Sequence, residues 1–166
     1  MLGACLVVVG LFAAGIARLE ERLADADHIV VGAFSRHTYE VVVPFGADGF
    51  IQLFRRFKVR RAWKGMIEAG DTLWFPAGPI RPARKGGIQT KGSHERSLPV
   101  VGQRYVLLLE DRAVGPYAGR VMINEKWMVR KNKVITEGGQ ARRPEEAPLV
   151  EIEMVARGSA MAPNSR

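Results

Sequence analysis

Residues Phe50 to Phe75 decide the fold, and they read FIQLFRRFKVRRAWKGMIEAGDTLWF. Over residues 51–64 the odd-numbered positions are mostly apolar, whereas four of the seven even-numbered positions are basic. A period of two is typical of a strand with one face on a core and the other in solvent. Gly65 ends this run, Ala69-Gly70-Asp71 turns the chain, and Thr72–Phe75 begins another β-rich run. The stretch therefore predicts a twisted antiparallel sheet or small barrel with a strongly basic outer strand.

The phase of this long strand assigns directions to its aromatic side chains. The odd phase directs Trp63 into the core, and we expect Tyr105, Leu107 and Leu109 as its neighbours. The even phase puts Phe54 beside the cations, where its ring is the evident candidate for stacking on a ligand. The three tryptophans, Trp63, Trp74 and Trp127, are expected to fill the core or its margin.

Shorter segments before and after this stretch complete a mainly β chain. Apolar spacing predicts a short helix over residues 18–27 with Arg22 on its outer side, and Gly32 suggests a bulge or a close backbone approach. Lys131-Asn132 is expected at a hairpin turn, because Asn tolerates positive φ. Residues 76–99 have no periodicity, and the spacing of Leu149, Ile152 and Val155 favours a short helix within 147–157. The expected strands are 28–34, 38–43, 104–110, 119–124, 127–130 and 133–136.

Length and composition indicate one globular domain. The chain has 166 residues, of which 47% are apolar and 25% are charged. The formal net charge is +8, and the excess of cations is concentrated in residues 50–64 and 78–100. A localised basic surface attracts polyanions such as nucleic acid, anionic lipid or acidic glycans, although a run of charge also serves simply as a solubilising face. Cys5 is the single cysteine, which excludes an intramolecular disulfide.

The N-terminal stretch Met1–Ala17 carries no charged side chain. It has the length of the apolar core of a signal peptide and is marginal for a membrane span. We therefore expect an exported protein, located in the periplasm, outside the cell or on the membrane. A buried N-terminal strand or helix is the alternative, and lipidation of Cys5 is a third. The expected organisation is a signal peptide or membrane anchor at 1–17, the domain at 18–137, and a C-terminal extension at 138–166.

Four short motifs carry a resemblance to a known family. They are Ala26-Asp27-His28-Ile29-Val30-Val31-Gly32, the strand end Trp63-Lys64-Gly65 with the residues before it, Gly70-Asp71-Thr72-Leu73, and Gly102-Gln103-Arg104-Tyr105 with the apolar run after it. In this order the chain resembles secreted bacterial proteins with a netrin-like domain, similar to the inhibitory domain of tissue inhibitors of metalloproteinases. The resemblance implies a five-stranded OB-type antiparallel barrel.

The inhibitory mechanism of that family does not carry over. It requires an N-terminal cysteine fixed by a disulfide, and a chain cleaved near Ile16 or Arg18 has no cysteine there. No site residue is transferred from the resemblance.

The residue patterns indicate no catalytic, metal-binding or cofactor-binding residues. His28, His37 and His94 are too few and too scattered for a metal site, and Ser35 with His37 lacks an orienting acid. A non-catalytic binding or protein-interaction module is therefore the expected function, and an envelope enzyme is an alternative.

The basic strand is the candidate binding site, together with the cations of the segment after it. An acidic envelope polymer or another protein is the expected partner, with membrane contact through residues 1–17. An intracellular OB-type binder of single-stranded nucleic acid is the alternative if the chain stays in the cytosol. The candidate residues are Arg56, Lys58, Arg60, Lys64, Arg81, Arg84, Lys85 and Lys91.

Overall fold

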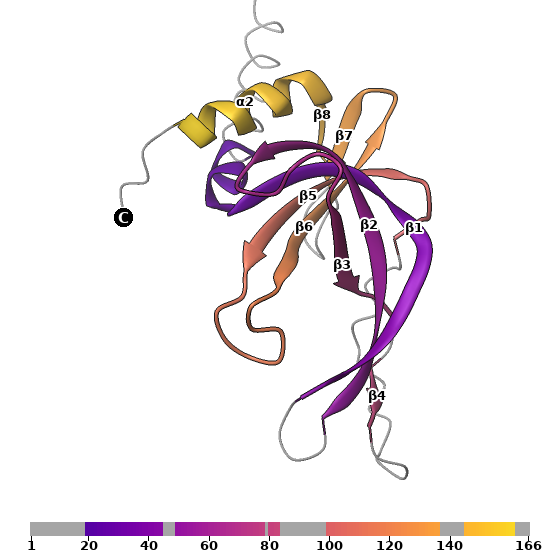
Figure 1. Ribbon diagram of the computed structural model, residues 1–166. Helices are drawn as coiled ribbons and strands as arrows, with labels where there is room; N and C mark the ends of the chain where they lie inside the picture. Colours follow the sequence, from indigo (N-terminus) through magenta and orange to yellow (C-terminus); the bar gives the residue numbers. More distant parts are fainter. Residues whose placement is uncertain (1–18, 45–48, 79, 84–98, 137–144, 162–166) are drawn as a thin grey trace, which may run out of the picture.

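A computed structural model describes residues 19–44, 49–78, 80–83, 99–136 and 145–161, the last with side chains as far as 158. Their strands form one antiparallel sheet of eight members in the order β3-β2-β1-β5-β6-β7-β8, with β4 paired to β2 (Figure 1). Residues 19–25 are helical, and α2 (Leu149–Met161) follows the last strand. The strands are β1 (His28–Val43), β2 (Phe50–Lys64), β3 (Thr72–Pro76), β4 (Arg81–Pro82), β5 (Arg104–Asp111), β6 (Val121–Arg130), β7 (Lys133–Thr136) and β8 (Glu146–Pro148).

The mainly β, antiparallel architecture and both short helices are confirmed. The five-stranded barrel is not confirmed, because eight strands form the described sheet and no pairing among them joins its outer members. β1 and β6 are each continuous, although the sequence predicted two strands in each region. β4 lies inside the segment that shows no periodicity, and α2 begins two residues later than expected.

The central strand β5 is buried on both faces, which explains its unbroken apolar sequence. Strand alternation sends Val106 and Leu108 to one side and Tyr105, Leu107 and Leu109 to the other. The first side belongs to a helix-side core, in which Leu19, Leu23, Ile152 and Ala156 of the two helices cover the sheet. The second belongs to an aromatic core formed by the curled sheet. Its rings include Phe34, Phe57, Phe75 and Tyr105, in edge-to-face contacts with centroids 4.9–6.2 Å apart.

Trp63 is buried as predicted, with 5% of its surface exposed, but its expected neighbours are wrong. It lies in the helix-side core with Val106 and Leu108, not in the aromatic core. The β1–β2 register shifts between Val31 and Gly32 and again between Ile29 and Val30. These irregularities break strict alternation along β2. As a result, Val59 lies in the aromatic core, whereas Trp63, four residues later, lies in the helix-side core.

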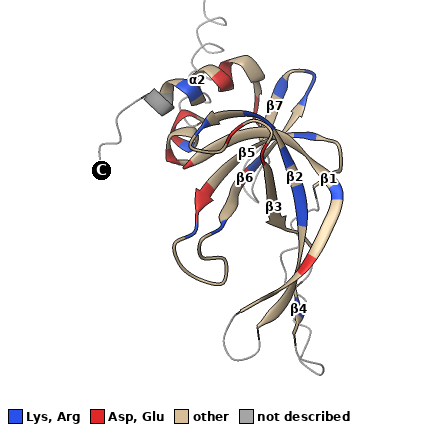
Figure 2. Cartoon of the chain, in the orientation of Figure 1, with Lys and Arg blue, Asp and Glu red and all other residues tan. Residues whose placement is uncertain are grey.

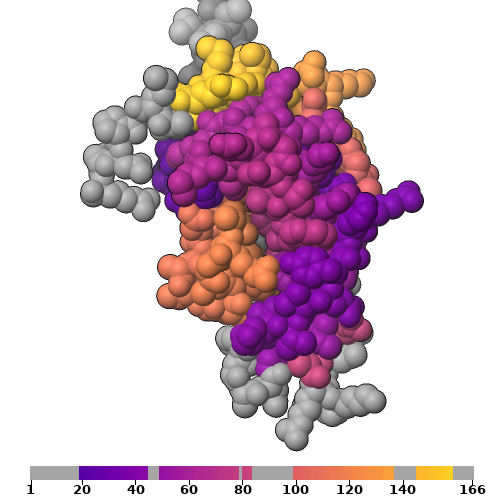
Figure 3. All heavy atoms as spheres, viewed as in Figure 1, coloured from indigo at the N-terminus to yellow at the C-terminus, as the bar shows by residue number. Residues whose placement is uncertain are grey.

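At the start of β2 the buried side chains are at even-numbered positions, whereas the sequence predicted that the odd-numbered positions face the core. Gln52 and Phe54 are 2% and 0% exposed, so Phe54 is not available for stacking on a ligand. The connection between β5 and β6 lies against the β1–β2 hairpin (Figure 3) and covers these side chains. Tyr117 donates its hydroxyl to Gln52 Oε1 at 3.1 Å, its ring lies 6.4 Å from that of Phe54, and Arg120 lies 4.7 Å over the Phe54 ring. This long-range contact leaves no trace in the local periodicity.

Two local predictions are confirmed. Lys131 and Asn132 have φ of 45° and 61°, and they join β6 to β7 as a hairpin. At Gly32, an added Cβ would lie 2.1 Å from the carbonyl oxygen of Lys58. The close backbone approach of β1 and β2 therefore requires glycine there.

Candidate anion-binding surface

Three cations of β2, Arg56, Lys58 and Arg60, are partly or fully exposed, and the first lies across from a tryptophan of β3. The pairing of β2 with β3 is unbroken from Phe54 to Lys58, so alternation directs Arg56 and Lys58 to the same side. Their Cα partners on β3 are Trp74 and Thr72, respectively. Figure 2 shows the Lys and Arg residues along β2, which contains no acidic residue. This part of the sheet is a continuous basic strip.

Arg56 is held in place by the side chains of Ser35 and His37 on β1. Its Nε donates to Ser35 Oγ at 3.0 Å, and its NH2 group donates to His37 Nδ1 at 2.9 Å. Ser35 Oγ also accepts the backbone N–H of His37 at 3.4 Å. The β1–β2 register shifts between Phe34 and Thr38, and the extra β1 residues carry these two acceptors. Within the described ranges, the guanidinium is therefore oriented without a carboxylate partner.

Lys58 and Arg60 are exposed, and neither has an ion pair with any carboxylate in the described parts of the chain. Lys58 is the β2 partner of Ala33, whose β5 partner is Arg104. Directly opposed residues on paired strands share a face of the sheet, so Lys58 and Arg104 lie on either side of the small Ala33 side chain. We define the basic strip as Arg56, Lys58, Arg60 and Arg104.

Two other candidate cations have partners within the fold. Lys64 Nζ donates to the carbonyl oxygens of Leu23 and Ala24, at 3.3 and 2.6 Å, and so satisfies the C-terminal end of the first helix. Arg81 on β4 forms an ion pair with Glu40. The remaining candidates, Arg84, Lys85 and Lys91, lie outside the described residues.

His28 is buried at the start of β1. It is 6% exposed, and its Nε2 lies 3.2 Å from both carboxylate oxygens of Asp111, 83 residues away. Its Nδ1 accepts the backbone N–H of Met66 at 3.3 Å. Both ring nitrogens are thus engaged, and the residue joins the start of β1 to the end of β2. The motif containing His28 and the Trp63-Lys64-Gly65 motif therefore meet in space.

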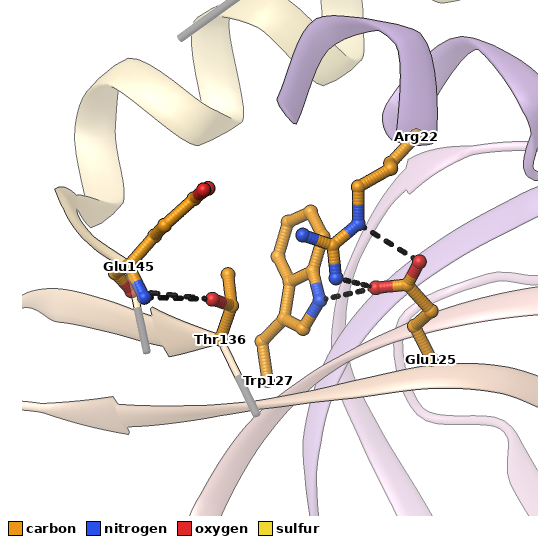
Figure 4. Close-up of polar contacts among 5 residues, drawn as sticks. All are labelled: Arg22, Glu125, Trp127, Thr136 and Glu145. Carbon is orange, nitrogen blue, oxygen red and sulfur yellow. Dashed lines mark hydrogen bonds and ion pairs between the residues drawn. The ribbon is translucent and has the colours of Figure 1, made fainter. Parts of the chain in front are cut away.

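A second polar cluster fastens the N-terminal helix to β6 (Figure 4). The Arg22 guanidinium pairs with the Glu125 carboxylate, and Arg22 Cζ lies 4.9 Å over the Trp127 ring. Trp127 Nε1 donates to the same carboxylate at 2.8 Å. Arg22 is half-buried, not on the outer side of its helix as predicted. The close-up also shows Thr136 Oγ1 accepting the backbone N–H of Glu145 at 3.0 Å. These contacts are structural.

Among the described titratable groups, Tyr117 has a clear pKa shift. Burial raises the pKa of the Tyr117 hydroxyl, and the positive charge of Arg120 partly opposes that increase. The phenol therefore remains neutral at physiological pH and serves as a donor to Gln52.

Within the described ranges, no group of three or more His, Cys, Asp or Glu side chains is placed to hold a metal ion. The described helices also include none long and apolar enough to cross a membrane. Scans against protein-family models, curated proteins and solved structures found no match.

Proposed function

We propose that the protein is an exported, non-catalytic binding module whose basic strip binds an acidic polymer of the cell envelope. The observation that carries the proposal is the set of neighbouring cations, Arg56, Lys58 and Arg60, without carboxylate partners in the described residues. A strip of uncompensated positive charge on a rigid sheet favours a polyanion, because contact releases the counterions of the polymer. Export rests on the uncharged stretch Met1–Ala17.

An OB-type, netrin-like domain is part of this proposal. Five strands support it: β1 pairs with both β2 and β5, while β3 and β6 extend the sheet on either side. In this arrangement one long strand belongs to both halves of a curled sheet, as in a partly open Greek-key barrel. Three of the four residues of the basic strip lie on the second strand, and OB folds bind oligonucleotides and oligosaccharides on that part of the sheet.

An intracellular binder of single-stranded nucleic acid is the second candidate. The observation that favours it is Trp74, a half-buried indole directly across from Arg56. Bases stack on aromatic side chains beside a positively charged groove. Intact mass and fractionation of the native protein separate the two locations. Full-length protein in the soluble cytosolic fraction would contradict export and favour nucleic acid.

Salt dependence of binding tests the basic strip. We expect the logarithm of the affinity for heparin or another acidic glycan to fall linearly with the logarithm of salt concentration. The double substitution Lys58→Ala with Arg60→Ala should lower the magnitude of that slope by about 1.4 to 1.8, since each lost contact removes about 0.7 to 0.9. Isothermal titration at several salt concentrations measures it.

A matched control removes the same charge elsewhere. Arg130 and Lys133 occupy directly opposite positions on the two strands of the β6–β7 hairpin, and both side chains are exposed. Arg130→Ala with Lys133→Ala should leave the slope nearly unchanged. Equal slopes for all three proteins, or no binding to glycan, DNA or anionic vesicles, would remove the polyanion proposal and leave protein interaction. Hydrolysis of any member of a broad substrate panel would indicate an enzyme instead.

A further inference from the structure

The described partners of Arg56, like those of Arg55 and Arg104, carry no negative charge, whereas several other arginines pair with a carboxylate. The guanidiniums of Arg22, Arg61 and Arg81 each pair with a glutamate. That of Arg56 is bound by a serine hydroxyl and a histidine nitrogen, at 3.0 and 2.9 Å. These acceptors fix its orientation but contribute no negative charge. The result is a cation whose geometry is determined before any ligand arrives, which reduces the entropy lost on binding.

The Arg56 donors that have no partner among the described residues suit an oxyanion. A guanidinium has five N–H donors in a planar fork, and the described contacts occupy Nε and one N–H of the NH2 group. The others are able to bind a carboxylate, sulfate or phosphate through more than one oxygen. Lys58 lies on the same side of β2, about 7 Å further along the strand. A second negative group of the same ligand would meet it there.

Trp74 supplies an apolar surface beside this fork. Its Cα is paired with that of Arg56 on the neighbouring strand, at the strand spacing of about 5 Å. Tyr39 supports the indole in an edge-to-face contact, with centroids 4.6 Å apart, and Tyr39 in turn stacks on the buried Phe54. The indole is half-buried and held by a packed aromatic column. An aromatic platform with an adjacent oriented cation fits a ring that carries a negative substituent.

We propose that Arg56 and Trp74 form a subsite for one acidic sugar unit of a polysaccharide, and that Ser35 and His37 are positioning residues for Arg56. The inference rests on the proposed binding function and specifies its ligand. The acidic substituent binds the Arg56 fork, the sugar ring stacks on Trp74, and Lys58 meets the next negative group along the chain.

The arrangement of aromatic side chains favours a glycan over nucleic acid. Nonspecific binding of single strands uses successive aromatic platforms, on which one base after another stacks. Beside the basic strip, the described aromatic side chains provide one such place. Phe54 is fully buried, and Tyr39 is packed against both Phe54 and Trp74. A polymer with charge on every unit and stacking at a single unit matches this surface.

Substitution at constant charge tests the subsite. Arg56→Lys keeps the positive charge but loses the planar fork, so affinity for a short sulfated or uronic-acid oligosaccharide should fall about tenfold, as expected for lost charge-assisted hydrogen bonds. Arg130→Lys, the same substitution at an exposed position of the β6–β7 hairpin outside the basic strip, is the matched control and should change affinity less than about twofold. Ligand should also quench tryptophan fluorescence in the wild type but not in Trp74→Phe, because Trp63 and Trp127 are buried.

Substitutions at Ser35 test separately whether this residue positions Arg56. Ser35→Ala should reduce affinity without changing the urea unfolding midpoint, and Ser35→Thr, which keeps the hydroxyl, should restore it. Unchanged affinity in Arg56→Lys would overturn the subsite while salt-dependent binding by the basic strip persists. Tighter binding of oligodeoxythymidine than of either acidic oligosaccharide, with Trp74 quenching, would overturn the choice of glycan. Failure of the wild type to bind any polyanion would instead contradict the proposed function itself.

Discussion

Gly65, at the end of the long basic strand, is expected to be among the least replaceable residues of the domain. Its φ is +88°, and a Cβ built on it would lie 2.1 Å from His28 Nδ1 and 2.8 Å from the carbonyl oxygen of Asp27. Alanine there meets two penalties. The left-handed backbone costs about 1 to 2 kcal/mol for a residue with a Cβ. The second penalty comes from the His28 ring, which has to move.

The cost of moving His28 follows from its contacts. Displacement breaks the bond from the Met66 N–H to Nδ1, at 3.3 Å, and the contact of Nε2 with Asp111, at 3.2 Å. At about 1 kcal/mol for each hydrogen bond, the total for Gly65→Ala is about 3 to 4 kcal/mol. That is a large share of a typical net stability of about 5 to 15 kcal/mol. Urea unfolding monitored by tryptophan fluorescence measures it.

Gly70→Ala is the matched control. Its φ is +100°, but a Cβ there has nothing within 4 Å, so we expect the backbone cost alone, about 1 to 2 kcal/mol. In a His28→Ala background the cost of Gly65→Ala should also fall by about 1 to 2 kcal/mol, which a double-mutant cycle reports as coupling. Equal costs for Gly65→Ala and Gly70→Ala, with no coupling to His28, would refute the packing argument.

Two further predictions concern stability. Trp63→Ala should cost about 3 to 5 kcal/mol in urea unfolding, because it leaves a cavity in the helix-side core; a cost below about 1 kcal/mol would contradict its burial. Tyr117→Phe should cost about 1 kcal/mol at pH 8, because buried Gln52 loses its donor. The raised pKa of Tyr117 makes the wild type lose stability as pH rises above the unfolded value of 10.0, so the difference should shrink by pH 11. A difference independent of pH would show that Tyr117 titrates normally.

Sequence reasoning found the candidate surface because charge and alternation are local properties. Arg56 and Lys58 occupy the predicted phase of β2, and Lys131-Asn132 forms the predicted turn. The doublets Arg55-Arg56 and Arg60-Arg61 already interrupt strict alternation in the sequence. These doublets indicated that side chains do not alternate regularly along the whole of β2. Arg60-Arg61 lies at a shift of the β1–β2 register, and Arg55-Arg56 lies opposite another.

By itself, the sequence determined that the chain is mainly β, that the strand at residues 50–64 carries exposed cations, and that Trp63 is buried. These follow from side-chain period and composition, which depend on neighbours along the chain. Only the tertiary structure decided which core receives Trp63, that Tyr117 buries Phe54, and that Arg56 meets Ser35 and His37. Each depends on strand register, bulges or contacts between distant residues, such as the pair formed by Arg22 and Glu125 across 103 positions. No local pattern encodes such pairings, because their free energy is gained only when the sheet has assembled.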